Sequence, residues 1–158
     1  MPLDKSLHQL VHRSWNIAQG LPQGTIRAIA QTPDGYIWLG TQEGLVRFDG
    51  VRFQTWNVTN TPELKASKVQ TLLAASSGDL WIGTWAGAVR YRGGQFTGFD
   101  KDNGLPAGPV FSLTEGPEGT IWIGTDGGGL SKYHDGHIVT FTTEQGLPSQ
   151  RIRALHTT

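Results

Sequence analysis

Apolar and polar residues alternate along this chain in short runs, and turn residues separate one run from the next. In the first part of the chain, such runs cover residues 25–31, 36–41, 45–48 and 51–56. Alternation with a period of two is typical of a half-buried β-strand. Pro33-Asp34-Gly35 lies between the first two runs, and Asp49-Gly50 lies between the last two. Both residues of the second pair are expected to take positive φ, so the pattern predicts four antiparallel strands joined by tight turns.

The same pattern returns at a nearly constant interval. Tryptophans followed by an apolar residue, glycine and threonine stand at Trp38, Trp81 and Trp122, which are 43 and 41 residues apart. Gly-Leu-Pro occurs at 20–22, 104–106 and 146–148. The expected fourth position holds Thr61-Pro62-Glu63-Leu64 instead. No long run keeps the 3.6-residue period of a helix, which argues against helical repeats. Four short strands about every 42 residues are the pattern of a β-propeller blade.

We therefore predict an all-β fold, a partial β-propeller of about three and a half four-stranded blades, in one domain over residues 1–158. The repeats cover approximately 20–61, 62–103 and 104–145, between a leading outer strand at 12–17 and a trailing inner strand at 150–156. Closed propellers typically have about 4 to 8 blades. Three alternatives stay open: the front of a longer protein, which we favour, a ring completed by further copies, or an open arc.

Residues that recur at one position of the repeat are expected to serve the fold. The tryptophans can wedge between adjacent blades, and the following glycines allow a neighbouring backbone to approach. This structural set comprises Trp38, Trp81, Trp122, Gly40, Gly83 and Gly124. Asp34 and Glu118 lie in turns that resemble an Asp-box, where the side chain is expected to cap the hairpin.

Residues that differ between repeats are candidates for recognition. The turns between second and third strands contain Gln42, Glu43, Trp85 and Asp126, and they should lie on one face of a propeller. Trp85 could stack on a sugar ring while Glu43 and Asp126 take its hydroxyls, or Trp85 could fill a gap between blades. Arg27 and Arg153 share one inner-strand position. They are predicted either to line the channel or to contact a neighbouring blade.

The composition of the chain excludes several classes of partner and binding site. Lys plus Arg and Asp plus Glu each number 13, so no basic excess favours nucleic acid. The absence of cysteine excludes disulfides and thiolate metal sites. We expect no membrane contact by this segment, because no run approaches the roughly 18 apolar residues that span a bilayer. No signal peptide is recognised. His134 and His137 flank a turn but offer only two ligands, so we expect neither a metal site nor a cofactor.

The order of motifs resembles the two-component regulator propeller repeat. Gly-Leu-Pro is followed by an inner strand, then Asp-Gly-Tyr-Ile-Trp-Leu-Gly-Thr, then Gly-Leu-Val-Arg-Phe-Asp-Gly, and the likeness extends from about residue 12 to 155. In the second repeat Gly-Leu-Pro is lost and Asp-Gly is reversed to Gly78-Asp79. The resemblance implies the extracytoplasmic, periplasmic sensor of a bacterial receptor whose output domain is often a histidine kinase or diguanylate cyclase, with ligands that are often carbohydrate-derived.

From this resemblance we expect a ligand-sensing domain that is not an enzyme by itself, because no kinase motif is present. Its partners would be a carbohydrate-derived small ligand and either the remainder of a parent receptor or further copies of itself. Two alternatives belong to other classes. One is a lyase-like propeller enzyme, similar to those that inactivate streptogramins, which would need a metal-backed His or carboxylate pair. The other is a self-assembling propeller scaffold.

Overall fold

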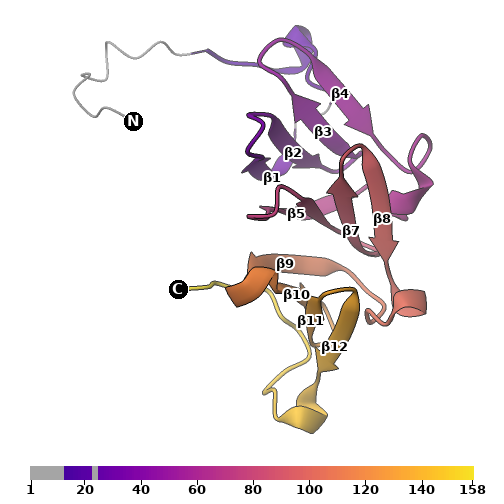
Figure 1. Cartoon of the computed structure of the whole chain (residues 1–158). Helices are drawn as coiled ribbons and strands as arrows, with labels where there is room; N and C mark the ends of the chain where they lie inside the picture. The colour runs from indigo at the N-terminus through magenta and orange to yellow at the C-terminus, as the bar shows by residue number, and fades with distance from the viewer. Residues whose placement is uncertain (1–12, 23–24) are drawn as a thin grey trace.

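The computed structural model describes residues 13–22 and 25–158, and it contains three four-stranded antiparallel sheets that follow one another as an arc (Figure 1). The first blade consists of β1 (Ile26–Gln31), β2 (Ile37–Thr41), β3 (Leu45–Phe48) and β4 (Phe53–Trp56). The second consists of β5 (Val69–Ala74), β6 (Leu80–Thr84), β7 (Gly87–Arg92) and β8 (Gln95–Phe99). The third consists of β9 (Val110–Glu115), β10 (Ile121–Thr125), β11 (Leu130–His134) and β12 (His137–Phe141). The all-β propeller prediction is confirmed.

Neighbouring blades contact each other mainly through their first strands. β5 lies against β1 and β2, and β9 lies against β5 and β6. The strands β4, β8 and β12 form the opposite edges of the sheets, as Figure 1 shows. The first strand of each repeat is therefore the inner strand and the fourth is the outer strand.

The predicted tryptophans fill the seams between blades. Trp38 and Trp81 are only 1% and 2% exposed. Each ring lies on the outer strand of its own blade, with ring centroids 5.5 Å from Trp56 and 5.3 Å from Phe99 respectively. Burial of such large apolar rings supplies much of the energy that holds one blade to the next. Trp122 is only partly buried, because it faces the open side of the third blade.

The glycine after each tryptophan accepts a branched side chain from the following segment. A Cβ at Gly40 would lie 2.7 Å from Cγ1 of Val69, and one at Gly83 would lie 2.8 Å from Cγ1 of Val110. At Gly124 the corresponding distance is 2.7 Å, to Cγ2 of Ile152. Real Cβ atoms do not approach so closely, so glycine lets the inner strand of the next blade sit directly on the preceding sheet.

The hairpin turns differ more than the sequence predicts. Gly93-Gly94 and Asp135-Gly136 are two-residue turns with positive φ at both positions, as expected. The prediction for Asp49-Gly50 is wrong, because four residues join β3 to β4 and only Gly50 of that pair has positive φ. The Asp49 carboxylate accepts hydrogen bonds from the amides of Arg52 (2.7 Å) and Val51 (2.8 Å), which lower its pKa.

The acidic residues Asp34 and Glu118, in the turns between the first and second strands of their blades, have different roles. Asp34 accepts from the Thr32 hydroxyl at 2.5 Å and from the Tyr36 amide at 3.4 Å, so it caps its hairpin as predicted. Thr32 in turn accepts the indole N–H of Trp38 at 2.9 Å. The prediction that the Glu118 side chain caps its hairpin is wrong. Its backbone has φ 58°, and Glu118 shapes the turn through this left-handed bend within η5 (Pro117–Gly119).

A short 3-10 helix that ends in a left-handed residue precedes each blade, and another follows the last blade. Gly20, Gly104 and Gly146 end η2 (Ile17–Gln19), η4 (Lys101–Asn103) and η6 (Thr143–Gln145) with φ of 95°, 91° and 97°. In the first crossing η3 (Pro62–Leu64) keeps the same form, and Lys65 takes the left-handed position with φ 59°. Leu64 and Leu105 are completely buried in the seams. The repeat therefore keeps its crossing even where Gly-Leu-Pro is lost.

The two flanking strands are not formed. The prediction of a strand at 12–17 is wrong for the residues that the structure describes. Residue 12 lies outside the described part, residues 13–16 are irregular, and η2 follows them. The segment predicted as a strand at 150–156 forms one isolated bridge, between Arg151 and Asp126. A β-strand needs a paired neighbour for its amides and carbonyls. In the described chain no further sheet offers one to either segment.

Candidate functional site

The turns between second and third strands lie on one face with the crossings that lead into each blade. The amide of Trp85 donates to the carbonyl of Lys68 at 3.2 Å, and the amide of Asp126 donates to the carbonyl of Pro109 at 2.9 Å. We call this face, which carries Gln42, Glu43, Trp85 and Asp126, the turn face. The predicted candidates, apart from Arg27, therefore share a face but come from three different blades.

A repeated threonine holds each of these turns. The hydroxyls of Thr41, Thr84 and Thr125 donate to the carbonyls of Gly44, Gly87 and Gly129 at 2.9, 3.1 and 3.0 Å. The same oxygens accept turn amides at 3.1 Å, from Glu43 and Gly44 in the first turn, Ala86 in the second and Gly128 in the third. The threonine after the strand-two glycine thus makes a braced turn, and the side chains that differ between repeats project from it.

Trp85 is the prominent aromatic side chain of the turn face. It is 45% exposed, so it does not fill a gap between blades. The Lys68 ammonium lies 3.5 Å from its ring centroid, within the range of a favourable cation–π contact. An indole held in this way on a braced turn offers a flat apolar surface beside a positive charge. Gln42 and Glu43 are exposed on the neighbouring blade.

Asp126 and Arg27 differ from the other predicted site residues, Asp126 in its contacts and Arg27 in its location. Asp126 is partly buried and forms ion pairs with Arg151 (3.6 Å) and Arg153 (3.5 Å) of the trailing segment. Arg27 is exposed on β1, at the other end of the arc. Across the described residues, no hydrogen bond, ion pair or ring contact joins any two of the five predicted ligand-binding residues. Their role in binding stays a prediction.

Two cavities between blades were missed by the sequence analysis. One, of about 590 Å³, lies between the first two blades and is lined by Gln54, Trp56, Asn60, Glu63, Gln95 and Phe96, among others. The other, of about 510 Å³, lies between the second and third blades and contains Asp79, Arg90, Arg92 and Tyr133. These side chains come from different strands of two blades, so no local motif marks them. The reversed Gly78-Asp79 is the one sequence signal that leads there.

The second cavity contains a charged network. Arg92 donates to both carboxylate oxygens of Asp79, at 2.8 and 2.5 Å, and this pairing lowers the pKa of Asp79 and raises that of Arg92. Arg90 donates from Nη1 to the Tyr133 hydroxyl at 2.9 Å. The equivalent Arg47 of the first blade lies 4.2 Å from the Tyr36 ring centroid and donates to Gln54. A basic residue beside the seam aromatics is therefore a repeated feature of the fold.

In the part of the chain that the structure describes, the histidine pair has no third potential metal ligand close enough to complete a site. His134 and His137 face each other across β11 and β12. His134 contacts the Thr120 hydroxyl at 3.3 Å and the Asp135 carboxylate at 3.4 Å. Within residues 13–22 and 25–158, no three His, Cys, Asp or Glu side chains gather closely enough to hold a metal ion. Among the same residues, no helix is long and apolar enough to span a membrane.

Comparison with solved structures supports the propeller architecture. The extracellular domain of BT3049 from B. thetaiotaomicron, described as a hybrid two-component system, superposes with a TM-score of 0.77 at 21% identity, over 88% of this chain and 20% of that one. The corresponding domain of BT4673 gives 0.67 at 26% identity, over 85% and 19%. Virginiamycin B lyase from Staphylococcus aureus, in a complex with quinupristin, gives 0.67 at 20% identity, over 85% and 46%, a likeness of fold.

The family comparison identifies the repeat itself. This chain spans about a fifth of the length of the two B. thetaiotaomicron domains. No curated protein matches it. The family described as two component regulator propeller matches residues 20–43 and 104–127, which run from the glycine of the crossing through β1 and β2, and through β9 and β10, to the turn face. Two segments of this chain, at the first and third blades, therefore match the two-component regulator propeller family.

Proposed function

We propose that this chain is part of the ligand-sensing propeller of a bacterial two-component type receptor, located outside the cytoplasm and non-catalytic by itself. The observation that carries the proposal is the family match at two repeats, together with the likeness to extracellular domains of hybrid two-component systems. In this role the propeller supplies the recognition surface, and a kinase or cyclase output lies elsewhere in a longer receptor.

The turn face is the proposed binding surface, and its ligand is a carbohydrate-derived small molecule. Trp85 is exposed and supported by Lys68, so its ring can stack against the C–H face of a sugar. Glu43 and Gln42 present a carboxylate and an amide on the adjacent blade, and both groups accept hydrogen bonds from hydroxyls. The threonine-braced turns keep the cost of ordering this surface low.

Calorimetric titration with a panel of oligosaccharides tests the proposal. At least one member should bind, and Trp85→Ala should weaken its binding about tenfold, the loss expected for one stacked aromatic contact worth about 1.4 kcal/mol. Trp15→Ala is the matched control, because Trp15 is 40% exposed but lies on the first blade against Phe48. That control should bind normally. Silence across the panel, or equal binding by both variants, would contradict the proposal, and cleavage of a streptogramin by the chain would favour a lyase instead.

A further inference from the structure

The cavity of about 510 Å³ between the second and third blades lies at the opposite end of the sheets from the turn face. Its lining includes Ser77 of the β5–β6 turn, Glu118 of the β9–β10 turn and Asp135 of the β11–β12 turn. In an antiparallel sheet these turns lie at the end away from the turns between second and third strands. The cavity is therefore separate from the proposed binding surface, and both of its walls belong to complete four-stranded blades.

One change in the repeat shapes this cavity. Asp79 stands directly before β6, at the place that Tyr36 has before β2. In the first seam the Tyr36 ring packs against the buried core, and the guanidinium of Arg47 lies 4.2 Å from its centroid. The short side chain of Asp79 offers no such ring to Arg90, the counterpart of Arg47. Arg90 instead reaches across the seam, where its Nη1 donates to the Tyr133 hydroxyl at 2.9 Å.

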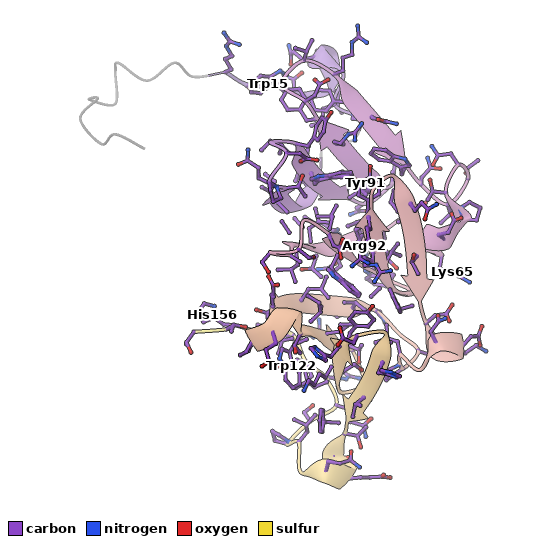
Figure 2. The ribbon with its side chains drawn as sticks, in the orientation of Figure 1. Trp15, Lys65, Tyr91, Arg92, Trp122 and His156 are labelled. Carbon is purple, nitrogen blue, oxygen red and sulfur yellow. The ribbon has the colours of Figure 1, made fainter. Side chains whose placement is uncertain are left out.

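The guanidinium of Arg90 has a neutral partner and no counter-charge. Among the described residues, no carboxylate forms an ion pair with it. Both carboxylate oxygens of Asp79 accept from Arg92 instead, and Arg92 is labelled in Figure 2. Arg90 is half-buried, and its Nε is buried without a hydrogen-bond partner. A cation withdrawn from water without a paired anion is costly, so a carboxylate that enters the cavity would bind favourably.

The rest of the lining restricts the kind of anion. Glu118 and Asp135 are exposed carboxylates of the third blade. They repel a doubly charged phosphate more strongly than a singly charged carboxylate, and they accept hydrogen bonds from hydroxyl groups. Ser77 adds a hydroxyl that can donate or accept. This lining therefore fits a small carboxylate that also carries several hydroxyl groups.

We propose that the cavity between the second and third blades binds a small hydroxylated carboxylate, with Arg90 as its anchor. The ligand carboxylate accepts from the Arg90 guanidinium, whose planar fork matches the two carboxylate oxygens. The Tyr133 hydroxyl positions that guanidinium from the third blade, and Glu118 and Asp135 accept from the ligand hydroxyls. The inference is independent of the sugar proposed for the turn face, because it uses no residue of that face.

NMR of the arginine side chains in the full chain tests the site. Gluconate supplies a carboxylate with five hydroxyl groups, sorbitol is its neutral counterpart, and sorbitol 6-phosphate carries a double negative charge. Burial should protect the Nε–H of Arg90 from exchange with water, and the absence of its signal from Arg90→Lys assigns it. Gluconate should shift this signal in a saturable way, and sorbitol should leave it in place. No saturable shift with gluconate overturns the proposal, and binding of sorbitol 6-phosphate as tight as that of gluconate overturns the choice of a carboxylate.

Calorimetric titration of gluconate into variants tests the anchor. Arg90→Lys keeps the charge but loses the fork, so the affinity should fall about tenfold. Arg47→Lys is the matched control, because it makes the same change in the first blade, over Tyr36, and should bind gluconate normally. Tyr133→Phe removes the hydroxyl that positions Arg90, so it should weaken binding about threefold, and it carries the test if Arg90→Lys does not fold by circular dichroism.

Two outcomes of this titration would contradict the assignment. Equal affinity of folded Arg90→Lys and Arg47→Lys would show that the guanidinium of Arg90 does not anchor the ligand. Loss of gluconate binding in Trp85→Ala would place the ligand on the turn face and overturn the cavity as its site. Normal gluconate binding by Trp85→Ala, together with loss in Arg90→Lys, supports the cavity whether or not an oligosaccharide binds the turn face.

Discussion

The seam between the first two blades gives the sharpest energetic test of the fold. Substitution of Gly40 by alanine adds a methyl group 2.7 Å from Cγ1 of Val69 and 3.3 Å from its Cβ. Both atoms belong to Val69, which lies on the inner strand of the next blade and is fully buried. Overpacking of this kind typically costs about 1–3 kcal/mol, so Gly40→Ala should lower the free energy of unfolding by about 2 kcal/mol.

Val69→Ala should relieve the clash that Gly40→Ala creates. Alone, it removes two buried carbon atoms, worth about 0.8 kcal/mol each plus a cavity cost, for a loss of about 2–3 kcal/mol. Added to the glycine change without coupling, the loss would be about 4–5 kcal/mol. Because the new methyl group enters the space that the valine leaves, we expect the double variant to lose only about 2–3 kcal/mol, a favourable coupling of about 2 kcal/mol.

Urea denaturation followed by tryptophan fluorescence and circular dichroism measures all four proteins of this cycle. Ile29→Ala is the control, since this side chain is 68% exposed on the same blade and its loss should cost less than about 0.5 kcal/mol. Strict additivity of Gly40→Ala and Val69→Ala would refute the assigned contact, because residues that do not touch show no coupling energy.

Three further outcomes follow from single side chains. Lys65→Gly should stabilise the chain by about 0.5 kcal/mol in urea denaturation, because glycine adopts the left-handed backbone at φ 59° without strain and the lost ion pair to Asp100 comes from a Lys65 side chain that is 52% exposed. Asp79→Asn should cost about 1–2 kcal/mol at pH 7, since Asp79 is nearly buried while Arg92 is mostly exposed. The pairing lowers the folded pKa of Asp79 below its ordinary 3.8, so its stabilisation is complete above that value and disappears as the pH falls through the folded pKa. Thermal melts of the unmodified chain and Asp79→Asn should therefore converge in acid, and a constant difference down to pH 2 would exclude this pairing as the cause. Trp85→Ala should leave the free energy of unfolding, measured in urea, within the scatter of surface substitutions, about 0.5 kcal/mol, and a larger loss would mean that this indole supports the fold.

Repetition is the reason that so much of the fold could be read from the sequence. Trp38, Trp81 and Trp122 mark the second strands, and the glycine after each marks the contact with the next inner strand. Each signal is short and local, and its recurrence removes the ambiguity of a single copy. The crossing at η3 was harder to recognise, because Lys65 adopts a backbone conformation that usually signals glycine.

The errors arose where a residue depends on something outside its own repeat. Trp15 has the spacing of an outer-strand aromatic, but residues 13–16 form no strand in the structure and the Trp15 ring lies against Phe48 instead. The binding role predicted for Asp126 is untested, but its ion pairs with Arg151 and Arg153 could not be read from the sequence and appear only in the structure. Exposure separates it from Trp85, which projects from the equivalent turn. Contacts across a seam join residues of different repeats, and alternation along one strand does not reveal them.

Hydrogen exchange at low protein concentration tests the arc of stacked blades most directly. The middle blade is covered on both faces, so the amides of β5, β6 and β7 should exchange most slowly. Protection should decrease toward β1 at one end and toward residues 150–156 at the other, where one face of each sheet is open. Protection that is uniform along the chain, or greatest at either end, would contradict three blades packed in series.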